Sequence, residues 1–187
     1  MNYADIKRVD VANGEGVRVS VFVSGCNHHC KGCFNECAWD FNYGKEFTQK
    51  EINQVLEYMN HDYIEGLSLL GGEPLEPQNQ AEVLNLVKQV KEKFPDKTIW
   101  CYTGFDFKDD IIDKMQKENS TTEELIKYFD VVVDGKFEMD KTSPKLRFRG
   151  SYNQRILDSK ETIKEDTPVE IPRLYEKERV ISKEVKL

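Results

Sequence analysis

Cys26, Cys30 and Cys33 stand within eight residues of one another, in the spacing C-x3-C-x2-C. Thiolates this close in sequence can bind one metal centre, because the backbone between them can curl around it. A structural zinc ion takes four protein ligands, and His28 or His29 offers the fourth. A cubane iron–sulfur cluster takes one ligand per iron, so three cysteines leave one iron open to a small molecule. The spacing alone fits both kinds of centre.

The two remaining cysteines do not change this interpretation. An odd count of five cysteines in a chain of 187 residues does not fit a disulfide framework. Catalytic thiol chemistry uses one or two cysteines rather than three in a tight cluster. We expect Cys37 to be a spare buried thiol and Cys101, within an apolar segment, to lie in the core.

The composition excludes some classes of function. The net charge is −7, with 27 Lys and Arg against 34 Asp and Glu, and an acidic domain lacks the basic face that nucleic acids bind. No apolar run approaches the length of a membrane span, so we expect no membrane partner. Five cysteines without a signal peptide predict a reducing, cytoplasmic location.

The elements that would position the cysteines follow from the apolar pattern. Val17–Val23 becomes continuously apolar and β-branched, which predicts a strand that enters a buried sheet and stops at Gly25, just before the cysteines. Three further apolar segments predict buried strands, at 67–70, Thr98–Tyr102 and 131–133.

Helical patterns separate these strands. Thr48 and Glu51 form a capping-box sequence, and apolar residues then repeat at helical spacing to Met59. Strands that alternate with helices predict an α/β fold with a parallel sheet, in which sites form at the carboxyl ends of the strands. The other helical patterns lie at 83–90, 111–115 and 121–129.

Each predicted strand ends in a distinctive motif. The cysteines follow the first strand, and the later ones end in Gly-Gly-Glu-Pro at 71–74, Thr-Gly at 103–104 and Asp-Gly-Lys-Phe at 134–137. Glycines at strand ends are common turn residues, but in a parallel sheet these four motifs would converge on one rim with a metal-ligand loop. We therefore expect the functional site at this rim.

The composition changes after Asp158. Residues 159–187 are dominated by charged side chains, contain two prolines and no glycine, and show poor periodicity. We predict a folded domain over 1–158 and a solvent-exposed charged tail over 159–187, with a partial strand or helix at 175–185.

The cysteine motif, together with Gly71-Gly72-Glu73-Pro74, resembles the radical S-adenosylmethionine (SAM) enzymes. Over about residues 3–158 the chain is more narrowly similar to the glycyl radical enzyme activases that act on anaerobic ribonucleoside-triphosphate reductases. The narrower resemblance rests on Asn13-Gly14-x-Gly16-x-Arg18, Phe22-Val23-Ser24-Gly25, Cys33-Phe34-Asn35, Pro77-Gln78-Asn79, Tyr102-Thr103-Gly104, Val133-Asp134-Gly135-Lys136-Phe137 and Arg149-Gly150-Ser151-x-Asn153-Gln154.

This resemblance implies a partial (β/α) barrel with parallel strands, of radical SAM type. It implies a [4Fe–4S] cluster held by Cys26, Cys30 and Cys33, with SAM bound to the open iron. Reductive cleavage of SAM would give a 5′-deoxyadenosyl radical, which takes a hydrogen atom from a glycine of the reductase. The implied partners are the anaerobic ribonucleoside-triphosphate reductase, as protein substrate, and flavodoxin or a similar electron donor.

The same resemblance assigns SAM to the strand ends. Gly71 and Gly72 lack side chains, so backbone can approach the cofactor closely. Glu73 can accept a hydrogen bond from the amino group of SAM, and Lys136 can face its carboxylate. The alternatives are a carboxylate at a helix N-terminus for Glu73 and an exposed lysine for Lys136.

Many members of the superfamily carry an aromatic residue just before the third cysteine, where it meets the adenine. This chain has Gly32 at that position and Phe34 just after Cys33. We therefore expect backbone atoms of Gly32, Cys33 and Phe34 to line the adenine site instead.

Three other functions stay open on the sequence. One is another small radical SAM enzyme, either a pyruvate formate-lyase activase or 7-carboxy-7-deazaguanine synthase. A second is a non-enzymatic interaction module that holds zinc on three cysteines and a histidine. A third is a redox carrier without SAM, which needs a complete fourth ligand, for which Cys37 is the nearby candidate.

Overall fold

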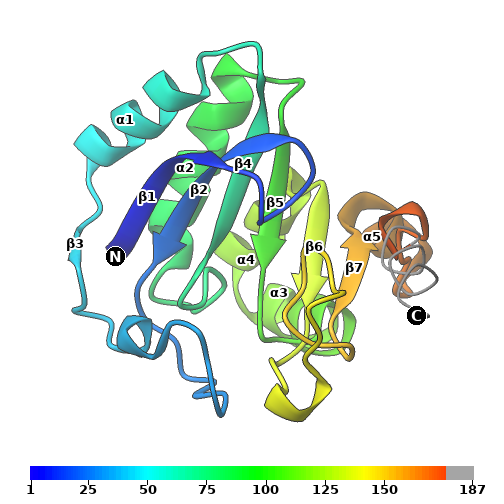
Figure 1. Cartoon of the computed structure of the whole chain (residues 1–187). Helices are drawn as coiled ribbons and strands as arrows, with labels where there is room; N and C mark the ends of the chain where they lie inside the picture. Colours follow the sequence, from blue (N-terminus) through cyan, green and yellow to red (C-terminus); the bar gives the residue numbers. More distant parts are fainter. Residues whose placement is uncertain (176–187) are drawn as a thin grey trace, which may run out of the picture.

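The structure, a computed structural model, describes residues 1–175 and shows an α/β fold built on one mixed sheet (Figure 1). The order of the strands across the sheet is β3-β1-β2-β4-β5-β6-β7. Their bounds are Asn2–Asp10 (β1), Val17–Val23 (β2), Lys45–Glu46 (β3), Ile64–Gly71 (β4), Thr98–Tyr102 (β5), Val131–Asp134 (β6) and Arg155–Asp158 (β7).

The centre of the sheet is parallel, as predicted. β2, β4, β5 and β6 pair in parallel with one another, in this order, so their carboxyl ends lie at the same edge. β1 pairs antiparallel with β2 and with β3, and β7 pairs antiparallel with β6. The apolar pattern does not predict these outer strands, because β1 exposes charged side chains, as strands outside the buried centre often do, and β7 has four residues.

Helices connect the parallel strands. The helix α1 begins after Thr48, which forms the predicted capping box with Glu51. The connection from β5 to β6 starts with a π-helical segment, Phe107–Met115, where the sequence predicts a helix. None of the helices within residues 1–175 is long and apolar enough to cross a membrane. The bounds are Gln49–Met59 (α1), Gln80–Lys93 (α2), Gln116–Glu118 (α3), Ser120–Leu125 (α4) and Ser159–Glu165 (α5).

The two faces of the sheet have different coverings, because successive side chains of a strand point to opposite faces. On one face Val21 and Leu69 pack with buried residues of α1, α2 and α4 into the main hydrophobic core. On the other face Trp100 packs with Phe148, from the loop before β7, and with Leu174, near the end of the described chain. Helices therefore cover one face, and loops cover the other.

The loop-covered face holds a buried arginine. Arg18 donates hydrogen bonds to the Ser68 hydroxyl (2.7 Å) and to the main-chain oxygens of Thr98 (2.9 Å) and Glu15 (3.2 Å). Burial lowers the pKa of Arg18 to about 10, so the guanidinium stays charged at neutral pH. The bond to Glu15 fastens the loop of residues 11–16 to the sheet.

The chain after β7 packs against the sheet in its described part. α5 follows β7 directly, and Leu174 is 3% exposed in the apolar cluster around Trp100. Residues 159–175 are therefore not the solvent-exposed appendage that the composition predicts. The element predicted at 175–185 lies outside the described residues apart from its first residue, and the domain boundary at 158 stays a prediction.

Asp130, just before β6, joins three elements. Its carboxylate accepts hydrogen bonds from the Ile99 amide (2.8 Å), from Lys91 (3.0 Å) and from Lys160 (2.6 Å). Burial alone would raise the pKa of Asp130, but these hydrogen bonds outweigh burial, and the pKa lies below its usual value. Such a carboxylate stabilises the fold above its unfolded pKa, and the contribution is lost as the pH falls through the folded pKa.

We expect Asp130→Asn to lower the free energy of unfolding by about 2 kcal/mol at pH 7, because Lys91 and the Ile99 amide lose a charged acceptor. The difference from the unchanged chain should shrink as the pH falls below about 4. Urea unfolding between pH 7 and pH 3 measures both effects. Asp62→Asn, at an exposed carboxylate, is the control. A loss that does not vary with pH would contradict the assignment.

Candidate functional site

A cavity of about 470 Å³ lies at the carboxyl ends of the four parallel strands. Its lining includes residues from each predicted motif: Cys26 after β2, Glu73 after β4, Gly104 after β5 and Phe137 after β6. The predicted convergence of the strand ends is therefore confirmed. The volume lies within the range of about 300–1,000 Å³ that is typical of small-molecule sites. Further lining residues come from the loops 11–16 and 146–154.

The three predicted metal ligands all line this cavity. Cys26 is buried, and Cys30 and Cys33 are half-buried. Cys101 is buried in β5, as predicted. The prediction that Cys37 is a buried thiol is wrong, because the short 3-10 helix that contains it buries the neighbouring residue and leaves Cys37 exposed.

The surroundings of Cys26 fit a thiolate-bound metal centre. Burial, partly offset by the His28 amide, raises the pKa of the Cys26 thiol to about 11, so its thiolate needs a cation such as a metal. Within residues 1–175, no group of three or more His, Cys, Asp or Glu side chains is arranged to hold a single metal ion. The cysteines of a [4Fe–4S] cluster bind different irons, so they need not meet at one point.

Glu73 connects the loop of residues 26–33, here named the cysteine loop, to the ends of two strands. It is 1% exposed, and its Oε2 accepts from the Gly104 amide (2.7 Å) and lies 3.0 Å from Nε2 of His28. Its Oε1 accepts from the Leu75 amide (2.9 Å). Because a carboxylate has about four acceptor positions, a ligand in the cavity can use a remaining one. The sequence indicates His28 only as an alternative ligand of a zinc ion, but in the structure its ring contacts the Glu73 carboxylate.

Gly71 and Gly72 line the cavity, but protein packing already requires both of them to be glycine. Gly71 has a φ of +106°, in a region that side chains disfavour, and a Cβ there would lie 2.7 Å from Cα of Phe22. A Cβ on Gly72 would lie 2.6 Å from the main-chain oxygen of Gly25. The two glycines allow the turn after β4 to lie against the end of β2. Their contact with a cofactor stays a prediction.

Glu76 and Asn79 fasten this turn to the cysteine loop. Glu76 is buried and accepts from the main-chain and side-chain amides of Asn27, at 2.9 and 3.1 Å. Asn79 is also buried, and its side chain donates to the main-chain oxygens of Ser24 (3.0 Å) and Glu73 (2.9 Å). These bonds hold the cysteines at a fixed position relative to Glu73.

The other predicted cofactor residues differ in where they lie. Cys33 and Phe34 line the cavity, and Phe34 is 84% exposed. Gly32 and Lys136 are not among the lining residues. Gly32 lies against Met139, whose Sδ would be 2.7 Å from a Cβ on the glycine, and Lys136 is exposed on the loop after β6. Contacts of Gly32 and Lys136 with SAM stay predictions.

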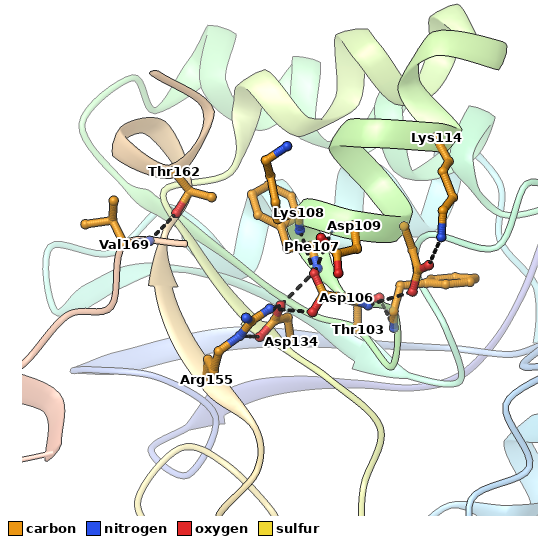
Figure 2. A network of polar contacts seen from close by, with 12 residues as sticks. Thr103, Asp106, Phe107, Lys108, Asp109, Lys114, Asp134, Arg155, Thr162 and Val169 are labelled. Atoms are coloured by element: carbon orange, nitrogen blue, oxygen red, sulfur yellow. Dashed lines mark hydrogen bonds and ion pairs between the residues drawn. The ribbon is translucent and has the colours of Figure 1, made fainter. Parts of the chain in front are cut away.

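Figure 2 shows a polar network at the ends of β5, β6 and β7. Asp134 is buried and accepts from Arg155 through both oxygens and from the Phe107 amide (2.9 Å). Arg155 also donates to Asp106 (2.8 Å), which caps the π-helical segment. The hydrogen bonds that Arg155 donates to the Asp134 carboxylate raise the pKa of Arg155, so its guanidinium stays charged. The network fixes three strand ends next to the cavity.

The loop 146–154 brings lining residues that the sequence alone does not place. Phe148, Arg149 and Gln154 all line the cavity. Gln154 accepts from the Gly150 amide (2.8 Å) and donates to the Gly135 oxygen (2.9 Å), which holds the loop against the end of β6. The signal for this loop is the Arg-Gly-Ser-x-Asn-Gln motif, which carries no information on its position in the fold.

The comparisons with known proteins agree with one another. Residues 12–157 match the family model described as a 4Fe-4S single cluster domain. The chain is 44% identical to the anaerobic ribonucleoside-triphosphate reductase-activating protein of Enterobacteria phage T4, over 83% of this chain and 93% of that protein. The proteins of the same name from Pasteurella multocida (strain Pm70) and Escherichia coli (strain K12) are 43% and 40% identical, over 83% of this chain and 96% and 97% of those proteins.

We expect Glu76→Gln to lower the free energy of unfolding by about 2 kcal/mol, because the glutamine NH₂ would face an Asn27 amide and leave a buried donor unsatisfied. Urea unfolding of the metal-free chain measures this loss, and alkylation of Cys30 should become faster as the loop loosens. Glu92→Gln, at an exposed position of α2, is the matched control. Equal stability of the two variants would show that Glu76 does not hold the loop.

Proposed function

Because the chain belongs to the family of anaerobic ribonucleoside-triphosphate reductase-activating proteins and contains a 4Fe-4S single cluster domain, we propose that it activates such a reductase by forming a glycyl radical on it. The chemistry would be reductive cleavage of SAM at a [4Fe–4S] cluster. The observation that carries this proposal is the shared cavity, since the three cysteines and the buried Glu73 carboxylate line one space at the strand ends.

In this proposal Cys26, Cys30 and Cys33 hold the cluster. The bound cluster and SAM supply the electron and the radical chemistry, and the protein supplies position. The cysteine loop is held from two sides, by the bonds of Glu76 to Asn27 and by a hydrogen bond from the Cys26 amide to the main-chain oxygen of residue 39 (3.1 Å). The buried Cys26 thiol would release its proton when the metal centre binds.

Glu73 is the residue best placed to bind the amino group of SAM. Gly104 and His28 orient its Oε2 at the cavity, and a hydrogen bond from a cationic group to this buried carboxylate is charge-assisted. We assign Lys136 a smaller contribution to the SAM carboxylate, because its side chain is exposed outside the cavity lining. The adenine would lie along the backbone of residues 32–34.

The fold and the partners extend the same proposal. The parallel strands would form part of a (β/α) barrel of radical SAM type, because their carboxyl ends surround the cavity. A loop of the reductase would enter the cavity beside Phe34, whose exposed ring belongs to the cavity lining. Flavodoxin or a similar donor would reduce the cluster, and the five free cysteines fit a reducing cytoplasm.

The proposal is tested by combining the anaerobically reconstituted chain with SAM, a reductant and an anaerobic ribonucleoside-triphosphate reductase. A glycyl radical signal in electron paramagnetic resonance should appear on the reductase, together with 5′-deoxyadenosine. Parallel mixtures with pyruvate formate-lyase, or with the precursor of 7-carboxy-7-deazaguanine, separate the other radical SAM functions. The proposal fails if the reductase gains no radical while an established activase produces one under the same conditions.

We expect about four iron and four sulfide per chain after anaerobic reconstitution, because a cubane cluster holds four of each. A zinc module would instead hold about one zinc ion and remain colourless. Cys26→Ser, Cys30→Ser and Cys33→Ser should each lose most of the iron, whereas Cys37→Ser should keep it, since Cys37 lies exposed. Iron loss in Cys37→Ser would favour a redox carrier with four protein ligands.

We expect Glu73→Gln to weaken SAM binding to the cluster-loaded chain by about tenfold to hundredfold, because a charge-assisted hydrogen bond is lost. Lys136→Met should weaken it by about threefold or less, as is usual for an exposed charge. Isothermal titration under anaerobic conditions measures both affinities, and thermal unfolding checks that Glu73→Gln remains folded. A larger effect at Lys136 than at Glu73 would reverse the assignment of the two residues.

A further inference from the structure

The segment of residues 169–175, here named the C-terminal strap, runs along the edge of the sheet. Its backbone pairs antiparallel with β7: the Asp158 amide donates to the Val169 oxygen (2.9 Å), and the Ile171 amide donates to the Ile156 oxygen (3.0 Å). The Val169 amide also donates to the Thr162 hydroxyl of α5 (3.0 Å; Figure 2). The strap lies beyond the family match, which ends at residue 157.

The strap contacts the loop 146–154 on one side. Leu174 is buried in the cluster that contains Phe148 of this loop. Just after the loop, the Tyr175 hydroxyl accepts from the Ile156 amide of β7 (2.7 Å). The guanidinium of Arg149 lies 4.6 Å from the centre of the Tyr175 ring, within the range of a cation–π contact. Phe148 and Arg149 line the cavity, so the strap supports part of the cavity wall.

The strap also reaches the loop 11–16. Nη1 of Arg173 lies 2.5 and 2.6 Å from the two carboxylate oxygens of Glu15. Asn13, two residues earlier in this loop, lines the cavity, and its main-chain oxygen accepts from the Ser68 hydroxyl (2.5 Å). The strap, a segment of seven residues, therefore contacts both the loop 11–16 and the loop 146–154. These two loops supply cavity-lining residues in addition to those at the strand ends.

We propose that the C-terminal strap positions these two loops and thereby sets the affinity of the cavity for its ligand. The part of the proposal that concerns affinity rests on the proposed function, in which the ligand is SAM. Arg173 and Glu15 act through the loop and are positioning residues. Their side chains are 61% and 40% exposed, so their ion pair adds little to the stability of the whole fold, and its effect on the loop can be measured separately.

A charge-reversal cycle in the full chain tests this inference. Arg173→Glu and Glu15→Arg should each speed amide hydrogen exchange of residues 11–16 in the metal-free chain by about threefold, and weaken SAM binding to the cluster-loaded chain by a similar factor. The double variant restores the pairing with reversed sign, and it should return both quantities towards those of the unchanged chain. Lys127→Glu, at an exposed lysine remote in sequence from the strap and both loops, is the charge-matched control.

A second variant addresses the other loop. Tyr175→Ala removes the ring that lies beside Arg149, together with the acceptor of the Ile156 amide in β7. It should speed exchange in residues 146–154 and leave residues 11–16 unchanged, since the ion pair is intact. A general loss of stability would instead speed exchange in both loops equally, which would count against the inference.

The outcomes separate the two proposals. Unchanged exchange in Arg173→Glu, or no recovery in the double variant, overturns the positioning role. Exchange that follows the cycle while SAM affinity stays constant overturns the link to the ligand. Exchange that follows the cycle in a chain that binds no SAM in any form supports the positioning role and overturns the proposed function.

Discussion

The site depends on how closely the turn after β4 lies against the cysteine loop. The Gly72 amide donates to the Val23 oxygen (2.7 Å), and the Glu73 amide donates to the Gly25 oxygen (2.9 Å), so the two strand ends are joined through their main chains. A Cβ on residue 72 would lie 2.6 Å from that same Gly25 oxygen, which only glycine avoids. The cysteines and the Glu73 carboxylate therefore share one cavity because two main chains lie in contact. This backbone contact determines where the side chains lie.

This contact buries two carboxylates beside the cysteines. Glu73 and Glu76 accept mainly from amides, which fix the position of a carboxylate without cancelling its charge. Both carboxylates raise the pKa of the Cys26 thiol further, after burial has raised it. The same negative environment that disfavours a free thiolate favours a cation in the cavity, whether that cation is a metal centre or the amino group of a ligand.

The sequence predicts the parts of this structure that repeat locally. β2, β4, β5 and β6 are mainly apolar and alternate with helical patterns, so their existence, their parallel direction and the rim at their ends can be predicted from the sequence. The charged composition of 159–175 hides Leu174, because an average over a segment does not show that one side chain is buried. The sequence also does not show why residue 72 must be glycine, because the requirement comes from a contact with residue 25, which is remote in sequence.

The two faces of the sheet differ in how much the loss of a single contact destabilises the fold. Under the helices, Leu69 and its neighbours are close-packed, and loss of such a side chain typically costs about 2–5 kcal/mol. Over the other face, the loops are held by a smaller apolar cluster and by single polar bonds. The bond from Gln154 to Gly135 contributes about 0.5–1.5 kcal/mol, and the bond from the charged Arg18 to Glu15 about 1.5–3 kcal/mol. The loops can therefore shift at a cost that leaves the sheet folded. A site whose proposed substrate is a protein loop needs this combination, because the cysteines and Glu73 must stay fixed while the cover of the cavity admits a partner.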